Sequence, residues 1–398
     1  MISARGARYD NPDGIVDFGN AENFLMHNLM TEYINHRRPF QWKLCTYNEG
    51  ATGSTRLCSA MAGLVNDYFA PLTPISADHI TFTAGVTALN EMITQVLCNE
   101  GDTIMLGRPS YGSFNKDLVL RTDVQLEYVG FNGADQFAPE VVDVYADALK
   151  QARERGSKVR ALLVCNPHNP LGRCYPQATL ERLVDFCVSE DLHLISDEIY
   201  ALSIFNPTAQ FTSVLGCGKD TPEYHNRVHV LYGMSKDFAG AGLRLGCLIS
   251  RSKVVNDAIR PICRFASPSE ISGFLAAELL DEKDLVKSFI EQSRKALFQS
   301  HRFAAGLLHE AGIKYYWPVD AGFFILMDLS SFLPLLETNG DAWAAERLLS
   351  KCFMDQKVDM SRGEVYHDER PGQFRLIHSF DQNMIIEGVR RIRKVLGI

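Results

Sequence analysis

Lys236 and Arg244, which stand eight residues apart, are the first two side chains whose chemistry is suggestive. Lys236 follows the strand-like run 228–232, at the position where open α/β sheets place ligands. The glycines around Arg244 permit a turn that brings its guanidinium back beside the lysine, where it could hold a phosphate. These glycines do not form a dinucleotide-binding turn, because they lead into a strand rather than open a helix. The alternative is that Lys236 is a solvated surface charge, as most lysines are.

Polar side chains also follow other strand-like runs. Asp197 could face a heterocyclic nitrogen and keep it protonated, and Tyr200, three residues on, could offer a phenol to the same ring. The amide of Asn169, between two prolines, could donate to a ring oxygen. Thr87 lies at the start of a helix whose free N–H groups suit a phosphate. Each has a plainer explanation, because a helix cap, a rigid Asn-Pro turn and a tight strand-to-helix turn would leave the same patterns.

Alternating strand-like and helix-like runs between about residues 46 and 280 predict an α/β domain with a mainly parallel sheet. Several runs are apolar at consecutive positions, which is typical of strands covered on both faces. Helical patterns at 88–98 and 176–190 lie between them. The predicted strands are 79–83, 103–106, 161–165, 193–196, 228–232 and 245–250.

The remainder of the chain reads differently. From Lys283 a long helical pattern is followed by mixed strands and helices, and the first 45 residues carry no strong strand signal. We therefore predict three parts. They are an N-terminal arm that belongs with the small domain, 1–45, a large domain, 46–282, and a small C-terminal α+β domain, 283–398.

The composition excludes several classes of protein. The chain has 398 residues, 46% hydrophobic and 22% charged, which is unlike a disordered or fibrous chain. Its 40 Lys and Arg against 48 Asp and Glu give a formal charge of −8, so we expect no nucleic-acid partner. No apolar run approaches the ~20 residues of a membrane-spanning helix, and we expect no signal peptide and no membrane partner. The ten scattered cysteines lack Cys-x-x-Cys spacing, which predicts reduced thiols and a cytoplasmic location.

Taken in chain order, these segments resemble the fold-type I pyridoxal-phosphate enzymes of the class I/II aminotransferase group. The resemblance runs from about Asn11 to the C-terminus and is closest to the 1-aminocyclopropane-1-carboxylate (ACC) synthase branch. Features of that branch are Asn-Pro-Asp-Gly at 11–14, Gly-Asn-Ala-Glu-Asn at 19–23 and Tyr-His-Asp-Glu-Arg-Pro-Gly-Gln-Phe-Arg at 366–375. The resemblance implies a large domain with a mainly parallel, seven-stranded mixed sheet and a smaller α+β domain. It also implies pyridoxal 5'-phosphate as the cofactor.

The resemblance implies three catalytic residues. Lys236 would form the internal aldimine with the cofactor and later move protons, Asp197 would pair with the pyridine nitrogen, and Tyr111 would stack on the ring. A buried carboxylate keeps that nitrogen protonated by charge pairing, and the ring can then store the electrons released at the substrate Cα. A desolvated, cation-rich pocket lowers the pKa of a lysine toward that of a nucleophilic free amine.

Further implied contacts hold the substrate and the cofactor. Arg375 would bind the α-carboxylate of an amino acid substrate with two parallel hydrogen bonds, and Glu22 and Asn169 would also contact the substrate. Tyr47 would reach the phosphate in the neighbouring subunit, which implies a homodimer. The implied cofactor-binding residues are Lys236, Val86 (through its backbone), Thr87, Tyr111, Asn169, Asp197, Tyr200, Ser235, Arg244 and Tyr47.

Four positions carry particular expectations. Gly233 stands where much of the group has a phosphate-binding serine, so we expect one hydroxyl contact fewer. Glu22 would lie near the substrate's sulfonium and stabilise positive sulfur, or it is an exposed glutamate at a helix start. His225 and His229 have the spacing of a metal pair, but they precede a strand and no third ligand is apparent, so we predict no metal site.

Three functions are compatible with the sequence. The favoured one is a lyase of the ACC-synthase-like type, which cleaves a carbon–sulfur bond of a cysteine conjugate or S-adenosylmethionine through an external aldimine and a quinonoid. The alternative is an aminotransferase that uses the same residues to move an amino group to a 2-oxo acid. A non-catalytic pyridoxal-phosphate-binding regulator is disfavoured, because no basic helix-turn-helix stretch precedes residue 46.

Overall fold

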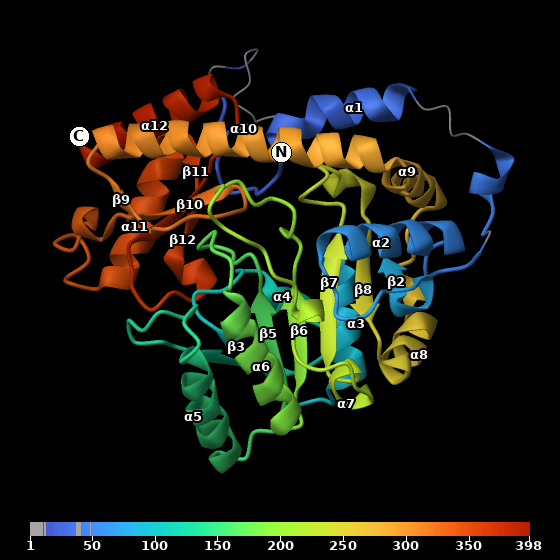
Figure 1. Cartoon of the computed structure of the whole chain (residues 1–398). Coiled ribbons are helices and arrows are strands. Elements are labelled where there is room, and N and C mark those ends of the chain that lie inside the picture. The colour runs from blue at the N-terminus through green and yellow to red at the C-terminus, as the bar shows by residue number, and fades with distance from the viewer. Residues whose placement is uncertain (1–10, 12, 37–40, 48) are drawn as a thin grey trace.

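A seven-stranded mixed sheet forms the centre of the computed structural model, which describes residues 11, 13–36, 41–47 and 49–398 (Figure 1). The strand order is β2-β8-β7-β6-β5-β3-β4. The neighbours from β7 to β4 are parallel, while β8 runs antiparallel to both β7 and β2. The predicted α/β class with a mainly parallel seven-stranded sheet is confirmed. The strands are β2 (Ile80–Thr83), β3 (Thr103–Gly107), β4 (Gln125–Val129), β5 (Val159–Cys165), β6 (His193–Asp197), β7 (Val228–Gly233) and β8 (Gly246–Ser250).

Consecutive apolar residues in the strands reflect burial on both faces of this sheet. In β5, Leu162 and Val164 pack in one hydrophobic cluster and Leu163 packs in another, because successive side chains point to opposite faces. The first cluster includes residues of α2 (Thr55–Tyr68), α5 (Val141–Glu154), α6 (Gln177–Ser189) and α9 (Glu270–Asp281). The second includes residues of α3 (Val86–Leu97), the short α4 (Phe114–Asp117) and α8 (Lys253–Ile262). The sheet is therefore the middle of three layers.

Strand β4 was not predicted from the sequence. Its residues, Gln-Leu-Glu-Tyr-Val, include two polar side chains, and only Val129 is fully buried. β4 is an edge strand that pairs only with β3, so it lacks the continuous apolar run of the inner strands.

A second, antiparallel sheet forms the C-terminal part of the chain. Its order is β12-β13-β10-β9, and β10 (Phe324–Asp328) pairs with β13 (Gln373–Ile377) along its whole length. The long helix α10 (Lys283–Glu310) crosses the top of the molecule above both sheets (Figure 1). The other elements are α11 (Ala342–Asp355), α12 (Gln382–Leu396), α7 (Pro222–His225) and the two-residue strands β9 (Lys314–Tyr315), β11 (Val358–Asp359) and β12 (Ser361–Arg362).

The N-terminal segment lies against the C-terminal part. β1 (Val16–Asp17) pairs in parallel with β11, and α1 (His27–His36) runs beside α10 (Figure 1). We keep the predicted division into 1–45, 46–282 and 283–398 as a working description of the chain.

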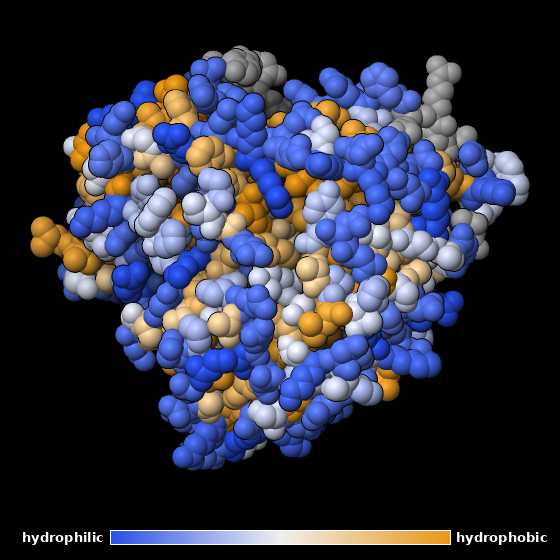
Figure 2. Space-filling view, viewed as in Figure 1, coloured by the Kyte–Doolittle hydropathy of each residue, from blue (hydrophilic) through white to orange (hydrophobic). Residues whose placement is uncertain are grey.

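Hydrophilic residues cover most of the face shown in Figure 2, and apolar residues reach the surface mainly near its centre, below α10. Among the described residues, no helix combines the length and the apolar character needed to cross a membrane.

Candidate active site

A cavity of about 240 Å³ lies at the carboxyl ends of the parallel strands, where open α/β sheets place ligands. Polar residues from loops that are distant in sequence meet there because β5, β6 and β7 end side by side. Ten predicted site residues line the cavity: Glu22, Val86, Thr87, Tyr111, Asn169, Asp197, Tyr200, Ser235, Lys236 and Arg244. Of the other two, Arg375 is hydrogen-bonded to one of these ten, whereas Tyr47 is exposed on the surface of this chain.

An anion-binding cradle is formed where β2 leads into α3. Gly85 takes a φ of +91°, which turns the chain so that α3 begins at Val86 and leaves its first N–H groups without partners in the helix. A Cβ at Gly85 would lie 2.5 Å from Nη2 of Arg244, so only glycine permits the guanidinium to approach this closely. Helix N–H groups and an arginine together make a site that suits a phosphate.

Lys236 lies in a buried turn between β7 and β8. Its Nζ donates to the carbonyl oxygen of Ala21 at 2.6 Å, so the N-terminal segment forms one side of its surroundings. Burial, and then the charge of Arg375, lower the pKa of Lys236 to about 8. A substantial fraction of the amine is therefore neutral and nucleophilic near neutral pH.

Asp237, the next residue, anchors this turn. Its carboxylate accepts hydrogen bonds from the Leu202 amide (2.9 Å), the Ser203 hydroxyl (2.5 Å) and the Tyr232 hydroxyl (2.9 Å). These contacts connect the lysine turn to the loop after β6 and limit its movement.

Asp197 and Glu198 are adjacent buried carboxyl groups with different surroundings. Asp197 lines the cavity and accepts a hydrogen bond from the Ile199 amide at 3.2 Å; burial raises its pKa to about 7. Glu198 accepts from the Ser196 hydroxyl and the Val214 amide, and burial raises its pKa to about 8. Asp197 is thus the carboxyl group available to a ligand, and a cation opposite it would favour its ionised form.

Arg375, on β13, brings the C-terminal sheet into the site. Its Nη1 donates to Oδ1 of Asn169 at 2.9 Å and its Nη2 donates to the carbonyl oxygen of Gly19 at 2.7 Å. The rings of Phe324 and Tyr366 lie 5.4 and 5.2 Å from the guanidinium carbon. Its buried Nε has no hydrogen-bond partner among the described residues, and the two bonds to Asn169 and Gly19 use only two of the five N–H donors of the guanidinium.

The sequence analysis missed six residues that line the cavity: Asn20, Asn90, Asp117, Cys165, Ile199 and Ala241. Nδ2 of Asn90 lies 3.3 Å from Oδ2 of Asp117. Asn90 comes four residues after Val86, on the same face of α3, so the helical period was a usable signal for it. No comparable signal marked Asp117.

Gly233 and the two histidines also have structural explanations. A Cβ at Gly233 would lie 2.4 Å from the carbonyl oxygen of Leu245, so a serine would not fit there unless the adjoining strand moved. His225 contacts Asp220 at 2.7 Å, whereas His229 contacts the His193 ring at 2.9 Å. The described part of the chain contains no group of three or more residues that could hold a metal ion.

Comparison with known proteins identifies the family. The model of the family "Aminotransferase class I and II" matches residues 48–392. The chain belongs to this family. Members use pyridoxal 5'-phosphate, and the protein is a pyridoxal-phosphate-dependent enzyme near the ACC synthase branch. The resemblance seen in the sequence is therefore confirmed.

Individual relatives agree with this assignment. The chain is 30% identical to "Probable aminotransferase tcpI" of Claviceps purpurea over 100% of its own length and 92% of that protein. It is 31% identical to 1-aminocyclopropane-1-carboxylate synthase of Nicotiana tabacum, over 98% of its own length and 80% of the relative. The crystal structure of an aromatic aminotransferase from Pyrococcus horikoshii shares the fold, with a TM-score of 0.80 at 20% identity, over 96% of this chain and 95% of that one.

The residues in the cavity fit pyridoxal phosphate. The Gly85 cradle, which a Cβ would fill, suits the phosphate. Asp197 is a buried carboxyl group whose ionised form a cationic partner, such as a protonated pyridine nitrogen, would stabilise. Lys236 supplies a buried amine of lowered pKa for the aldehyde.

Proposed function

We propose that the protein is a carbon–sulfur lyase of the ACC-synthase-like type, acting on a sulfur-containing α-amino acid such as a cysteine conjugate or S-adenosylmethionine. The observation that carries the proposal is the position of Glu22, which lines the same cavity as Lys236 and Asp197. Asn20 donates to Oε1 of Glu22 at 2.7 Å and His27 lies 3.6 Å from Oε2, so both oxygens have partners that orient them. A fixed anion beside a positively charged or developing cationic sulfur stabilises that charge.

The proposed cofactor contacts follow from the cavity. The first N–H groups of α3, Thr87, Ser235 and Arg244 would hold the phosphate, and Lys236 would bind the aldehyde carbon through Nζ. Bound there, pyridoxal phosphate supplies a conjugated ring that accepts the electron pair released at the substrate Cα. The carboxylate of Asp197 would face the pyridine nitrogen, and burial makes that charge pair effective because little water screens it.

Three other side chains would complete the cofactor site. Tyr111 would cover one ring face; its own ring is fixed at a right angle to that of Phe114, with centroids 5.2 Å apart. Tyr200 and Asn169 would meet the ring oxygen. Tyr200 is 2% exposed and its ring is held edge-on by Phe323 and Phe324.

The chain's own residues would also orient the substrate and move its proton. Arg375 would bind the α-carboxylate, because it is buried, permanently charged and oriented by Asn169. Lys236, released from the aldehyde when substrate binds, would take the Cα proton, since a pKa near 8 suits a general base at neutral pH. Glu22 would then favour departure of the sulfur-bearing group.

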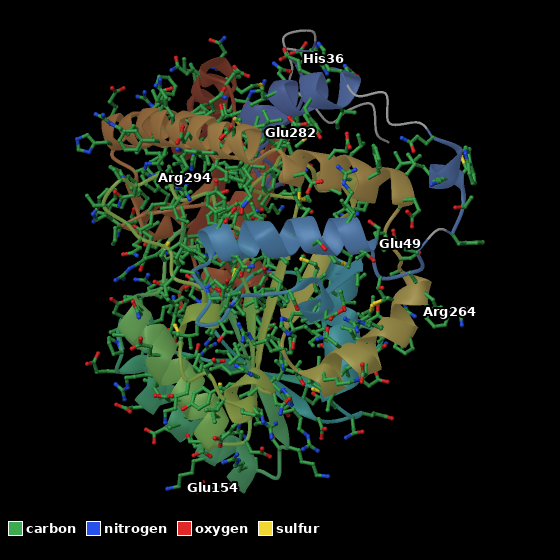
Figure 3. The ribbon with its side chains drawn as sticks, turned by 45° about the vertical axis from the view of Figure 1, so that its right-hand side comes forward. His36, Glu49, Glu154, Arg264, Glu282 and Arg294 are labelled. Atoms are coloured by element: carbon green, nitrogen blue, oxygen red, sulfur yellow. The ribbon has the colours of Figure 1, made fainter. Side chains whose placement is uncertain are left out.

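We also propose a homodimer in which Tyr47 reaches the neighbouring site. Tyr47 is 97% exposed, and Trp42 and Phe265 are 74% and 83% exposed. Exposed large apolar residues gathered in one area are typical of an interface. Glu49, two residues after Tyr47, and Arg264, next to Phe265, lie on the same side of the molecule in Figure 3. We propose a cytoplasmic location because the ten cysteines, all within the described ranges, are free thiols.

An aminotransferase is the second candidate. The relative from Claviceps purpurea carries that name, and the same lysine, aspartate and arginine would serve transamination. The two reactions differ in where the proton goes after it leaves Cα, which these three residues do not decide.

Product analysis tests the proposal. Purified protein with bound cofactor is incubated with S-adenosylmethionine, with a cysteine S-conjugate, and with common amino acids plus 2-oxoglutarate. A cyclopropane product, or thiol with pyruvate, is expected. Glutamate formation without carbon–sulfur cleavage would overturn the lyase and support the aminotransferase.

The variant Glu22→Gln sharpens this test. It keeps an acceptor for Asn20 but removes the charge, so cleavage of a sulfonium substrate is expected to fall more than cleavage of a neutral thioether. Equal effects on both substrates would contradict the role given to Glu22.

A further inference from the structure

The loop 363–372, between β12 and β13, contains most of the sequence motif 366–375, in which only the last residue has a proposed role. That motif, 366–375, ends in Arg375, the proposed carboxylate-binding residue, three positions after the loop. None of the residues 363–372 lines the cavity, yet several of them are buried, including Tyr366 and Asp368.

The base of the loop is closed by one buried carboxyl group. Glu346, on α11, is 0% exposed. Its Oε1 accepts from the Glu364 amide at 2.8 Å and its Oε2 accepts from the Gly372 amide at 2.6 Å. The two ends of the loop are therefore tied to the same side chain, which makes the loop a compact unit rather than a flexible connection.

The far side of the loop contacts the large sheet. The carboxylate of Glu369 accepts from the amides of Phe131 (3.1 Å) and Asn132 (3.4 Å), just after β4, and lies 3.8 Å from the guanidinium of Arg108. The ring of His367 stacks on that of Tyr128 in β4, with centroids 4.0 Å apart.

A backbone hydrogen bond brings this contact to the cavity itself. The amide of Ser110 donates to the carbonyl oxygen of Tyr366 at 2.9 Å. Ser110 immediately precedes Tyr111, the proposed ring-stacking residue, and the ring of Tyr366 lies under the guanidinium of Arg375. One short segment thus contacts Arg375 directly and holds the residue that immediately precedes Tyr111.

Two positions of the facing surface, Gly112 and Gly130, have no side chain where the loop approaches. A Cβ at Gly130 would lie 2.3 Å from Oε1 of Glu369, and a Cβ at Gly112 would lie 2.6 Å from the carbonyl oxygen of Val365. A side chain at Gly112 would force the loop backbone to move, and a side chain at Gly130 would displace the Glu369 carboxylate from its present position.

We propose that the loop 363–372 fixes the spacing between Arg375 and Tyr111 before substrate binds, with Glu369 and His367 as its positioning residues. Arg375 is then in place for the α-carboxylate before substrate binds, and the C-terminal part does not first have to close onto the large sheet. Because these groups are already ordered, ordering them does not weaken substrate binding. The proposal rests on the role of Arg375 given under the proposed function, but not on which reaction follows.

The test compares two ligands of protein with bound cofactor, monitored by the change in cofactor absorbance. L-Methionine carries the α-carboxylate, and 3-methylthiopropylamine has the same side chain without it. In Glu369→Ala, L-methionine is expected to bind about tenfold more weakly, the equivalent of ~1.4 kcal/mol. The amine is expected to bind as in the unchanged protein.

A second readout does not depend on ligand binding. Hydrogen exchange at the amides of Ser110 and Phe131 is expected to accelerate in Glu369→Ala, because their acceptors lie on the loop. Glu369→Gln, which keeps an oxygen acceptor, should give a smaller change in both measurements. The matched control is Glu364→Gln on the same loop, whose carboxylate pairs with Arg347 and Arg362 within the C-terminal part and should leave both unchanged.

Faster exchange together with unchanged L-methionine affinity would overturn the proposal, and so would equal weakening of both ligands. If Glu369→Ala loses enough thermal stability to indicate misfolding, the two ligands are compared in Glu369→Gln instead, and the same two results would overturn the proposal. If Arg375→Gln binds L-methionine as tightly as the unchanged protein, the role of Arg375 fails instead, so the two failures are distinguishable.

Discussion

The lowered pKa of Lys236 makes a quantitative prediction about how the protein captures its cofactor. With a pKa of about 8, about 10% of the amine is neutral at pH 7; with the ordinary value of 10.5 only about 0.03% would be. Because only the neutral amine attacks an aldehyde, cofactor-free protein should react with pyridoxal phosphate about 300 times faster at pH 7 than an exposed lysine of equal nucleophilicity. The rate should rise with pH and level off above about pH 8.

Replacing Arg375 by glutamine tests the cause of this shift. Burial is the larger cause of the lowered pKa, and the positive charge of Arg375 is the next. Removing that charge raises the pKa of Lys236, so the bend in the pH–rate profile, where the rate levels off, moves to higher pH. At pH 7 the variant should therefore react more slowly. Stopped-flow absorbance of cofactor addition across the pH range measures both quantities, and the ratio of the two proteins' rates cancels the cofactor's own titrations.

The matched control is Arg362→Gln, on the strand next to Arg375, because the Arg362 guanidinium is already paired with Glu364. It removes the same charge and should leave the bend in place. A bend near pH 10 in the unchanged protein, or an unmoved bend in Arg375→Gln, would refute this account of the lysine.

The remaining predictions concern the electron-accepting ring, the sheet and the dimer. Asp197→Asn should retain some cofactor but lose most turnover, and a fully active variant in a steady-state assay would contradict the pairing with the ring nitrogen. Gly233→Ser should lower the free energy of unfolding by about 1–3 kcal/mol in a denaturant titration, because its Cβ would collide with the Leu245 carbonyl; an unchanged midpoint would show that the strands adjust freely. Inactive Lys236→Ala and Tyr47→Ala proteins, unfolded and refolded together, should recover about a quarter of full activity, since half of randomly formed dimers carry one complete site. No recovery in mixtures shown to contain mixed dimers would exclude a shared site.

Much of the site could be predicted because its residues follow local patterns. Asp197, Asn169 and Lys236 each come directly after or shortly beyond an apolar strand, and parallel strands end at one edge of their sheet. Knowing the strands was therefore enough to predict that these side chains meet. The resemblance supplied Arg375 and Glu22, which lie far from that edge in sequence.

What could not be predicted depends on contacts between distant segments. Nothing near Glu346 indicates that its carboxylate ties both ends of a loop 18 and 26 residues further on. Gly233 was interpreted as a missing hydroxyl, although the structure shows a second constraint, the Leu245 carbonyl across the strand pair. Asp117 lines the cavity only because its short helix α4 packs beside α3. Such relations appear only once the chain is folded.

The contacts of the N-terminal segment have a practical consequence for handling the protein. The carbonyl oxygens of Gly19 and Ala21 accept hydrogen bonds from Arg375 and Lys236, so the leading peptide is held by the very groups that chemistry requires. A truncation that removes Gly19 and Ala21 would take away both acceptors, and the resulting loss of activity would be wrongly attributed to the catalytic side chains. An affinity handle attached after Ile398, which is 42% exposed and follows the closing helix, leaves both acceptors in place.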